Sequence, residues 1–175
     1  MTIIFLLVAR SLMLLSKTEM GHWEYAPFDP TGYFGFLYCI SNLKTNQYYW
    51  GKKQFLHLGK KRSKTYGKEM KWRTYTGSSK QLNEDIKLYK KESFKFTIVD
   101  LYKTKGGLYY SEAYSQMVSE CMTLTQLDGT PVFYNRQIAA IRFIPKEEPT
   151  LKTKRYITSL KRKINGTNSK KKSTM

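Results

Sequence analysis

The sequence predicts an α+β fold, an α/β sandwich in which helices flank a small three-stranded antiparallel sheet. Two aromatic-rich runs at 35–40 and 48–55 are separated by polar turn residues, a pattern typical of a β-hairpin. Alternation of apolar and polar residues begins at Phe94 and predicts a third strand over 94–102. Apolar residues at helical spacing predict one helix before this strand, from Ser78, and one after it, beyond Gly107.

The length and charge of the chain limit the number of domains and the kinds of binding partner that it can have. Its 175 residues suffice for one compact domain, expected at 31–145 between an N-terminal extension at 1–30 and a basic tail at 146–175. The 31 Lys and Arg exceed the 13 Asp and Glu and give a formal net charge of +18. Such a surface binds polyanions through counterion release, which favours nucleic acid. Charge alone would also suit ribosomal RNA or an anionic membrane surface.

The N-terminal apolar run at 3–15 does not have the pattern of a membrane span or a secretory signal. Arg10 and Ser11 interrupt it, it is too short to cross a bilayer comfortably, and no small-residue cleavage site follows it. We therefore expect no membrane association, and we interpret Met20 as the true start of translation. Cys39 and Cys121 lack the spacing of a disulfide framework or a metal knuckle, which favours the cytoplasm.

The hairpin carries two tyrosines, Tyr38 and Tyr49, that could share one face. Eleven residues separate them, and a turn of suitable register would bring both phenols together. Tyrosine is also common in strands for packing reasons alone, so the pair could be purely structural.

A basic, glycine-containing loop is expected at 59–70, because this stretch lacks apolar periodicity. Nine basic residues and one acid, Glu69, lie between Lys52 and Arg73. We interpret this imbalance as a phosphate-contacting surface. The candidate DNA-binding residues are Lys52, Lys60, Lys61, Arg62, Lys64, Lys68 and Lys71.

The two helices are expected to pack through regular apolar stripes. Ser78 could cap the first helix, whose stripe would be Leu82, Ile86 and Tyr89. Glu112 would lie beside the stripe of the second helix, which consists of Tyr110, Ala113, Tyr114, Met117, Val118 and Cys121.

The tail is expected to be largely disordered. From Leu151 to Met175 it contains nine Lys or Arg and no acid, a composition that cannot bury a core. The alternative is a short basic helix at 156–164 that forms on a nucleic-acid partner. Truncation after Thr150 should accordingly leave a folded domain.

The hairpin, Glu112 and several short motifs together resemble the GIY-YIG endonuclease family. Phe36-Leu37-Tyr38 stands where the family has Gly-Ile-Tyr, with Gly35 one position earlier, and Tyr49-Trp50-Gly51 stands for Tyr-Ile-Gly. Glu112 and Asn135 occupy the places of the family's metal-binding glutamate and late asparagine. The strings Gly-Lys-Lys at 51–53 and Trp-Arg-Thr-Tyr-Thr-Gly-Ser-Ser at 72–79 are similar to the phage-type, freestanding branch, which is homing-endonuclease-like.

The resemblance implies a site for phosphodiester hydrolysis. One divalent ion, Mg²⁺ or Mn²⁺, would be bound by Glu112, and Tyr38 or Tyr49 would act as general base with its pKa lowered by nearby cations. The basic insertion leaves the place of the family's arginine open between Arg73 and Lys53. Tyr75 would replace the family's His or Tyr, and Asn135 would order the site by hydrogen bonding.

The resulting hypothesis is a metal-dependent endonuclease acting on double-stranded DNA. It would work in the cytoplasm, that of an infected host cell if the chain is phage-encoded. No protein partner is implied, and the oligomeric state is open. The alternative is a noncatalytic, basic nucleic-acid-binding protein on the same fold, which would have no reason to keep the carboxylate of Glu112 amid positive charge.

Overall fold

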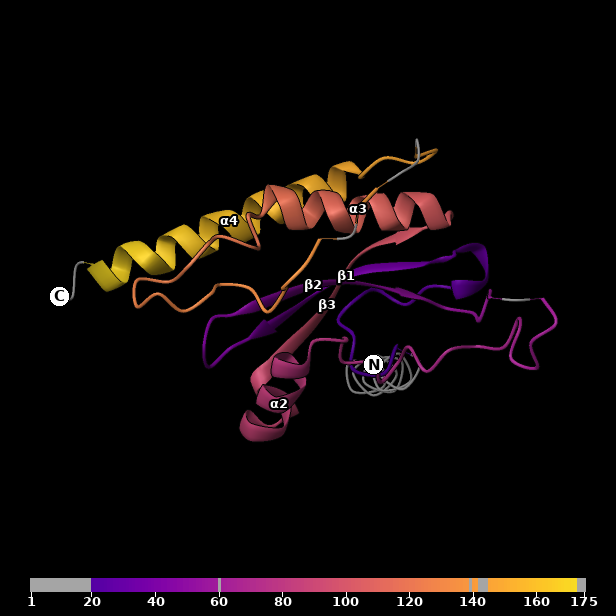
Figure 1. Ribbon diagram of the computed structural model, residues 1–175, viewed down its shortest axis with the longest axis horizontal. Coiled ribbons are helices and arrows are strands. Elements are labelled where there is room, and N and C mark those ends of the chain that lie inside the picture. The colour runs from indigo at the N-terminus through magenta and orange to yellow at the C-terminus, as the bar shows by residue number, and fades with distance from the viewer. Residues whose placement is uncertain (1–19, 60, 139, 142–144, 173–175) are drawn as a thin grey trace, which may run out of the picture.

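The computed structural model describes residues 20–59, 61–138, 140–141 and 145–172, and confirms the α+β fold (Figure 1). Three antiparallel strands form one sheet in the order β2-β1-β3. They are β1 (Gly35–Asn42), β2 (Tyr48–Gln54) and β3 (Phe94–Tyr102), which confirms the predicted hairpin and third strand. The central strand β1 is buried along its whole length.

The sheet register brings the two hairpin tyrosines to the same face. Tyr38 pairs with Gly51 and Ile40 pairs with Tyr49, so the tyrosines are diagonal neighbours across the two strands. On the other side of β1, Leu37 pairs with Asp100 but Tyr38 pairs with Ile98. The extra residue in β3 is a β-bulge, which reverses the facing of later residues and explains why alternation stops after Ile98.

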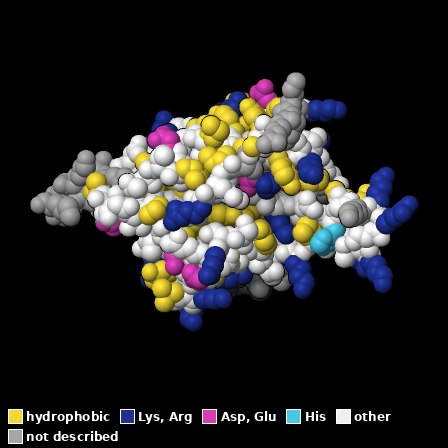
Figure 2. Space-filling view, viewed as in Figure 1, with side chains coloured by type: hydrophobic (Ala, Val, Ile, Leu, Met, Phe, Trp, Pro, Cys, Tyr) yellow, Lys and Arg dark blue, Asp and Glu magenta, His cyan; other side chains and the backbone are white. Residues whose placement is uncertain are grey.

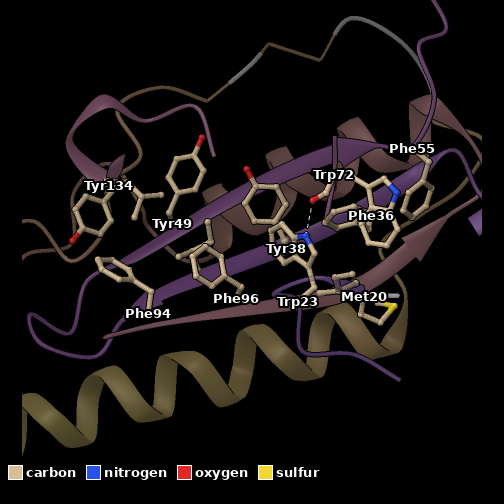
Figure 3. Close-up of a cluster of buried hydrophobic side chains, with 13 residues drawn as sticks. Met20, Trp23, Phe36, Tyr38, Tyr49, Phe55, Trp72, Phe94, Phe96 and Tyr134 are labelled. Carbon is tan, nitrogen blue, oxygen red and sulfur yellow. Dashed lines mark hydrogen bonds between the residues drawn. The ribbon is translucent and has the colours of Figure 1, made fainter. Parts of the chain in front are cut away.

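The first face of the sheet is covered by the N-terminal segment, by the loop after β2 and by α2 (Lys80–Tyr89). Trp23 is almost fully buried there, and its indole nitrogen donates to the carbonyl oxygen of Trp72 at 2.7 Å (Figure 3). Met20 is buried in the same cluster. The expected domain boundary at residue 31 is therefore too late, because residues from Met20 onward belong to this core.

Helix α2 begins one residue later than the sequence predicted. Ser79, not Ser78, is its N-cap and accepts from the backbone N–H of Leu82. The predicted stripe is confirmed, since Leu82 is fully buried while Ile86 and Tyr89 pack against the same cluster.

The second face is covered by α3 (Lys105–Val118) and α4 (Leu151–Lys172), which lie side by side on the opposite side from α2 (Figure 1). The expectation of a disordered tail is wrong here. Ile157, Leu160 and Ile164 of α4 are buried in the second core cluster. Their spacing places them on one face of a helix that docks on its own chain, where the high charge of the tail hid an apolar stripe.

The buried face of α3 matches the expected stripe only in part, since Ala113 and the following Cys121 are buried as predicted. Met117 is 66% exposed and Val118 is 38% exposed, whereas Leu108, Ser111 and Glu112 are buried. The helix is rotated so that small and polar side chains meet the sheet and α4. Glu112 thereby points into the protein.

Some predictions fall on residues outside the described ranges, namely the apolar run at 3–15 and Lys60. Among the helices that the structure describes, none is long and apolar enough to cross a bilayer.

Candidate active site

A polar pocket of about 250 Å³ opens beside β2, at the edge of the sheet. It brings together most of the residues that the sequence analysis predicted to be catalytic or metal-binding. Its lining includes Tyr38, Tyr49, Lys52, Lys53, Tyr75 and Glu112, together with Ser78 and Tyr109. These side chains come from the two hairpin strands β1 and β2, from the loop after β2 and from α3.

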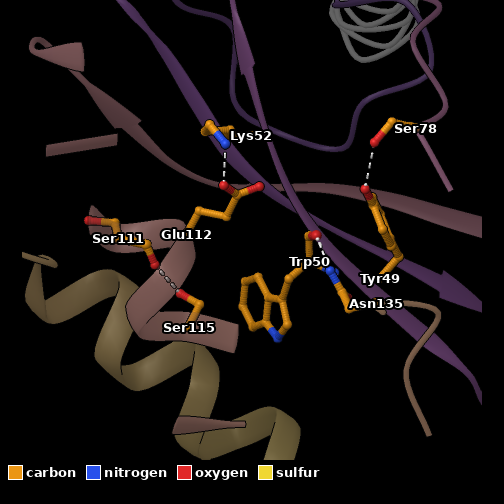
Figure 4. A network of polar contacts seen from close by, with 8 residues as sticks. All are labelled: Tyr49, Trp50, Lys52, Ser78, Ser111, Glu112, Ser115 and Asn135. Carbon is orange, nitrogen blue, oxygen red and sulfur yellow. Dashed lines mark hydrogen bonds and ion pairs between the residues drawn. The ribbon is translucent and has the colours of Figure 1, made fainter. Parts of the chain in front are cut away.

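The two hairpin tyrosines form one wall of the pocket. Their ring centroids are 6.1 Å apart, and Tyr75 packs edge-on against Tyr38 at 6.2 Å. The Tyr49 hydroxyl lies 3.1 Å from the hydroxyl of Ser78 (Figure 4). Tyr38 is 1% exposed and Tyr49 is 8% exposed, so only the oxygen ends of the rings reach the pocket.

Gly51 makes room for Tyr38. A Cβ atom at Gly51 would overlap the hydroxyl and the adjoining ring carbons of Tyr38. The glycine of the second motif is therefore required by its cross-strand partner, the tyrosine of the first motif.

The protonation of the phenols differs from what the sequence suggested. Burial raises the pKa of Tyr38 well above its ordinary value, and neighbouring Tyr49, Tyr75 and Glu112 raise it further. Burial also raises the pKa of Tyr49, although the hydrogen bond with Ser78 opposes that shift. The expected lowering of the pKa by nearby cations does not occur in the free protein, where burial disfavours the charged phenolate of both residues.

Lys52 and Glu112 form an ion pair on the α3 side of β2 (Figure 4). The Lys52 ammonium also lies 4.1 Å from the centroid of the Tyr109 ring. Burial raises the pKa of the Glu112 carboxyl, and Lys52 opposes that shift by stabilising the carboxylate. Lys52, predicted to contact DNA, thus lies in the pocket with the candidate metal ligand.

Lys53 faces the opposite side of β2, as alternation along a strand requires. Its ammonium lies 4.1 Å from the centroid of the Tyr75 ring, and burial lowers its pKa. Arg73 does not line the pocket; its guanidinium pairs with Glu69 and stacks on Trp72. Of the two candidates for the family's arginine, the structure places Lys53 in the pocket.

Asn135 holds the outer edge of β2. Its side-chain oxygen accepts from the backbone N–H of Trp50, and its amide nitrogen donates to the Trp50 carbonyl, both at 2.9 Å (Figure 4). These hydrogen bonds satisfy backbone groups that a neighbouring strand would otherwise pair. They fix the backbone of Trp50, which lies between Tyr49 and Gly51.

A comparison with family models identifies this architecture. The model described as "Putative endonuclease segE, GIY-YIG domain" matches residues 20–138. The chain belongs to the GIY-YIG endonuclease family. The match includes the hairpin, α2, β3, α3 and Asn135, and a domain of this family suggests DNA endonuclease activity. Neither the curated proteins nor the solved structures gave a match.

Apart from Lys52 in β2, the candidate DNA-binding residues of this GIY-YIG domain follow β2 in the chain. The exposed ones within the described residues are Lys61, Arg62, Lys64, Lys68 and Lys71. Figure 2 shows Lys and Arg side chains projecting around the rim of one face, with fewer acidic side chains among them.

The sequence did not indicate that Ser78 and Tyr109 belong to the pocket. The pattern around Ser78 is typical of a helix cap, and its contact with Tyr49 spans 29 positions. Tyr109 lies three residues before Glu112, nearly one helical turn, which is the signal that could have found it.

The pocket chemistry fits a sparsely ligated divalent ion. Within the described residues, no group of three or more His, Cys, Asp or Glu side chains could hold a metal. Mg²⁺ commonly uses one or two carboxylates, keeps several waters and takes oxygens from substrate phosphates. Glu112, in a polar pocket, meets that requirement.

Proposed function

We propose that this GIY-YIG protein is a divalent-metal-dependent endonuclease that hydrolyses phosphodiester bonds of double-stranded DNA. The supporting observation is the convergence of Tyr38, Tyr49, Lys53 and Glu112 on one pocket from three separate parts of the chain. Hydrolysis of a phosphodiester needs a base for the attacking water and positive charge near the phosphate oxygens. The pocket supplies candidates for both.

Glu112 would hold one Mg²⁺ or Mn²⁺ ion, with water and phosphate oxygens as its other ligands. The ion would supply electrostatic stabilisation of the charge that builds on the phosphate. The Lys52 ammonium stabilises the Glu112 carboxylate and so opposes the rise in its pKa that burial causes. Lys53 can contribute a second positive charge, because its ammonium lines the same pocket from the opposite side of β2.

Tyr38 or Tyr49 would accept the proton of the attacking water. The raised pKa of each phenol in the free protein makes its phenolate a strong base but a rare species at neutral pH. Ser78 and Tyr75 position the two rings through the contacts described above. Asn135 would act through the backbone of Trp50 and not on the substrate.

The test is cleavage of supercoiled plasmid by purified protein in Mg²⁺, compared with the same reaction in EDTA. Nicked or linear product in Mg²⁺ alone is the expected result. DNA binding in both buffers without any product would contradict the proposal and favour the noncatalytic binding protein. Glu112→Gln protein serves as control for a contaminating nuclease.

A further inference from the structure

A second groove of about 560 Å³ adjoins the active-site pocket. The two cavities share four lining residues, Tyr49, Lys52, Ser78 and Glu112. The second groove therefore starts where the proposed chemistry takes place. Its volume lies within the range of about 300–1,000 Å³ that small ligands occupy.

The outer part of this groove is suited to a phosphate. Arg136 follows Asn135 directly, and its exposed guanidinium donates to the side-chain oxygen of Gln81 at 3.1 Å. The first turn of α2 forms the facing wall, where the backbone N–H groups of Lys80 and Gln81 precede the capped N–H of Leu82. Glu84 also lines the groove, but Lys80 lies 3.9 Å from its carboxylate.

The inner part presents an amide without a protein partner. Gln116 lies four residues after Glu112 on α3, so the two side chains share a helix face and both line the groove. Gln116 is 5% exposed, and its side chain makes no hydrogen bond to any residue that the structure describes. Its amide is not enclosed by protein, so the groove's occupant can supply a partner for it.

We propose that this groove binds the nucleotide next to the scissile phosphate, with Arg136 at its phosphate and Gln116 at its base edge. The proposal rests on the proposed function, because it takes the neighbouring pocket as the site of hydrolysis. Guanidinium groups bind phosphate oxygens strongly, and a glutamine amide offers a donor and an acceptor to a base. Gln116 thereby gives the enzyme a base preference beside its cut.

The first test is the base composition around the cleavage site. Wild-type protein digests a duplex library of random sequence, and the new ends are sequenced. We expect one flanking position to show a preference of roughly five- to hundredfold, as one amide–base pair can provide. Gln116→Met should flatten that position alone. Gln126→Met removes an equivalent amide outside the groove, where Gln126 donates to Thr45, and should retain the wild-type pattern.

An unchanged base preference in folded Gln116→Met protein would overturn the role of Gln116, as would the absence of any flanking preference in wild type. A wild-type protein that cuts nothing would instead contradict the proposed function.

The second test measures binding alone, in EDTA, and does not depend on cleavage or on how well Gln116→Met folds. Affinity for duplex DNA is measured against salt concentration by fluorescence anisotropy. Arg136→Gln should reduce the log-log salt slope by about 0.9, the value for one phosphate contact. Lys87→Gln removes the same charge from the last turn of α2 and should leave the slope unchanged. Equal slopes for wild type and Arg136→Gln would show that Arg136 holds no phosphate.

Discussion

The Tyr38 hydroxyl occupies the space that a Cβ atom at Gly51 would need. The two residues pair across β1 and β2, one in each half of the family's double motif. The two halves of the motif thus pack as one unit. The absence of a side chain at Gly51 of β2 leaves room for the phenol of Tyr38 on β1. This relationship links the stability of the hairpin to the geometry of the pocket.

Gly51→Ala should both destabilise the protein and impair cleavage. The added methyl group must displace the buried Tyr38 ring, and overpacking of this kind costs about 1–3 kcal/mol. Urea unfolding gives the stability change, and plasmid cleavage gives the activity. Gly32→Ala is the control, because its Cβ would meet no atom within 4 Å. A Gly51→Ala protein with wild-type stability and activity would contradict the packing argument.

Glu112→Gln should lose metal-dependent cleavage while binding DNA nearly as well as wild type. The substitution removes the carboxylate but leaves the exposed basic loop intact. Plasmid nicking and anisotropy measure the two properties separately. Glu120→Gln breaks another ion pair, with Lys161, outside the pocket and should cleave normally. Comparable cleavage by Glu112→Gln and wild type would refute the metal assignment.

At least one of Tyr38→Phe and Tyr49→Phe should slow cleavage by roughly a hundredfold or more, the contribution expected of a general base. Each substitution removes one hydroxyl and keeps the ring, so both variants should fold. Single-turnover rates at saturating DNA provide the measurement. Tyr110→Phe, on the outer side of α3, is the matched control. Normal rates in both pocket variants would mean that the phenols serve packing alone.

The cleavage rate should rise with pH between about 7 and 9. Burial raises the pKa of Tyr38 and of Tyr49 above the ordinary value of 10.0, so the phenolate fraction increases tenfold per unit across this range. A plot of log kcat/KM against pH should have a slope of about one. His22 does not complicate the profile, because burial lowers its pKa to about 4. A flat profile would exclude a phenol as the base.

Helix α4 should prove essential for folding. Ile157→Ala and Ile164→Ala each remove a buried side chain and should cost about 2–5 kcal/mol. Truncation after Thr150 should abolish the cooperative urea transition, contrary to the expectation from sequence. Ser159→Ala, on the exposed side of the helix, should change stability little. Retention of a full-stability transition by the truncated chain would show that α4 is only loosely docked.

The sequence predicted the sheet well, because strand alternation and turn residues are local signals. It also indicated that a turn of suitable register would bring Tyr38 and Tyr49 together, and the register of β1 and β2 does so. The docking of α4 was missed for a physical reason. The nine basic residues of the tail gave it the composition of a disordered segment, yet Ile157, Leu160 and Ile164 lie on one helix face against the core.

The grouping of the candidate site residues in one pocket was predicted in outline only. The sequence could not decide whether Lys53 or Arg73 takes the place of the family's arginine, because the path of the long loop between them determines where Arg73 lies. In the structure Lys53 contacts Tyr75, whereas Arg73 pairs with Glu69. The buried side of α3 was predicted only in part, since Ala113 is buried as expected but Met117 and Val118 are exposed while Ser111 and Glu112 are buried. The Glu112 side chain can be buried because it pairs with Lys52. A pair between residues this far apart in the chain produces no periodic pattern in the sequence.

Under the proposed function, the pairing of Lys52 with Glu112 would also affect the order in which the metal ion and DNA bind. A carboxylate without a counterion would repel an approaching phosphodiester, and DNA would then have to wait for the cation. In this protein the Glu112 carboxylate already has an ammonium group as its counterion. DNA could therefore dock before the metal ion, and the protein could search along a duplex without a metal ion in its pocket.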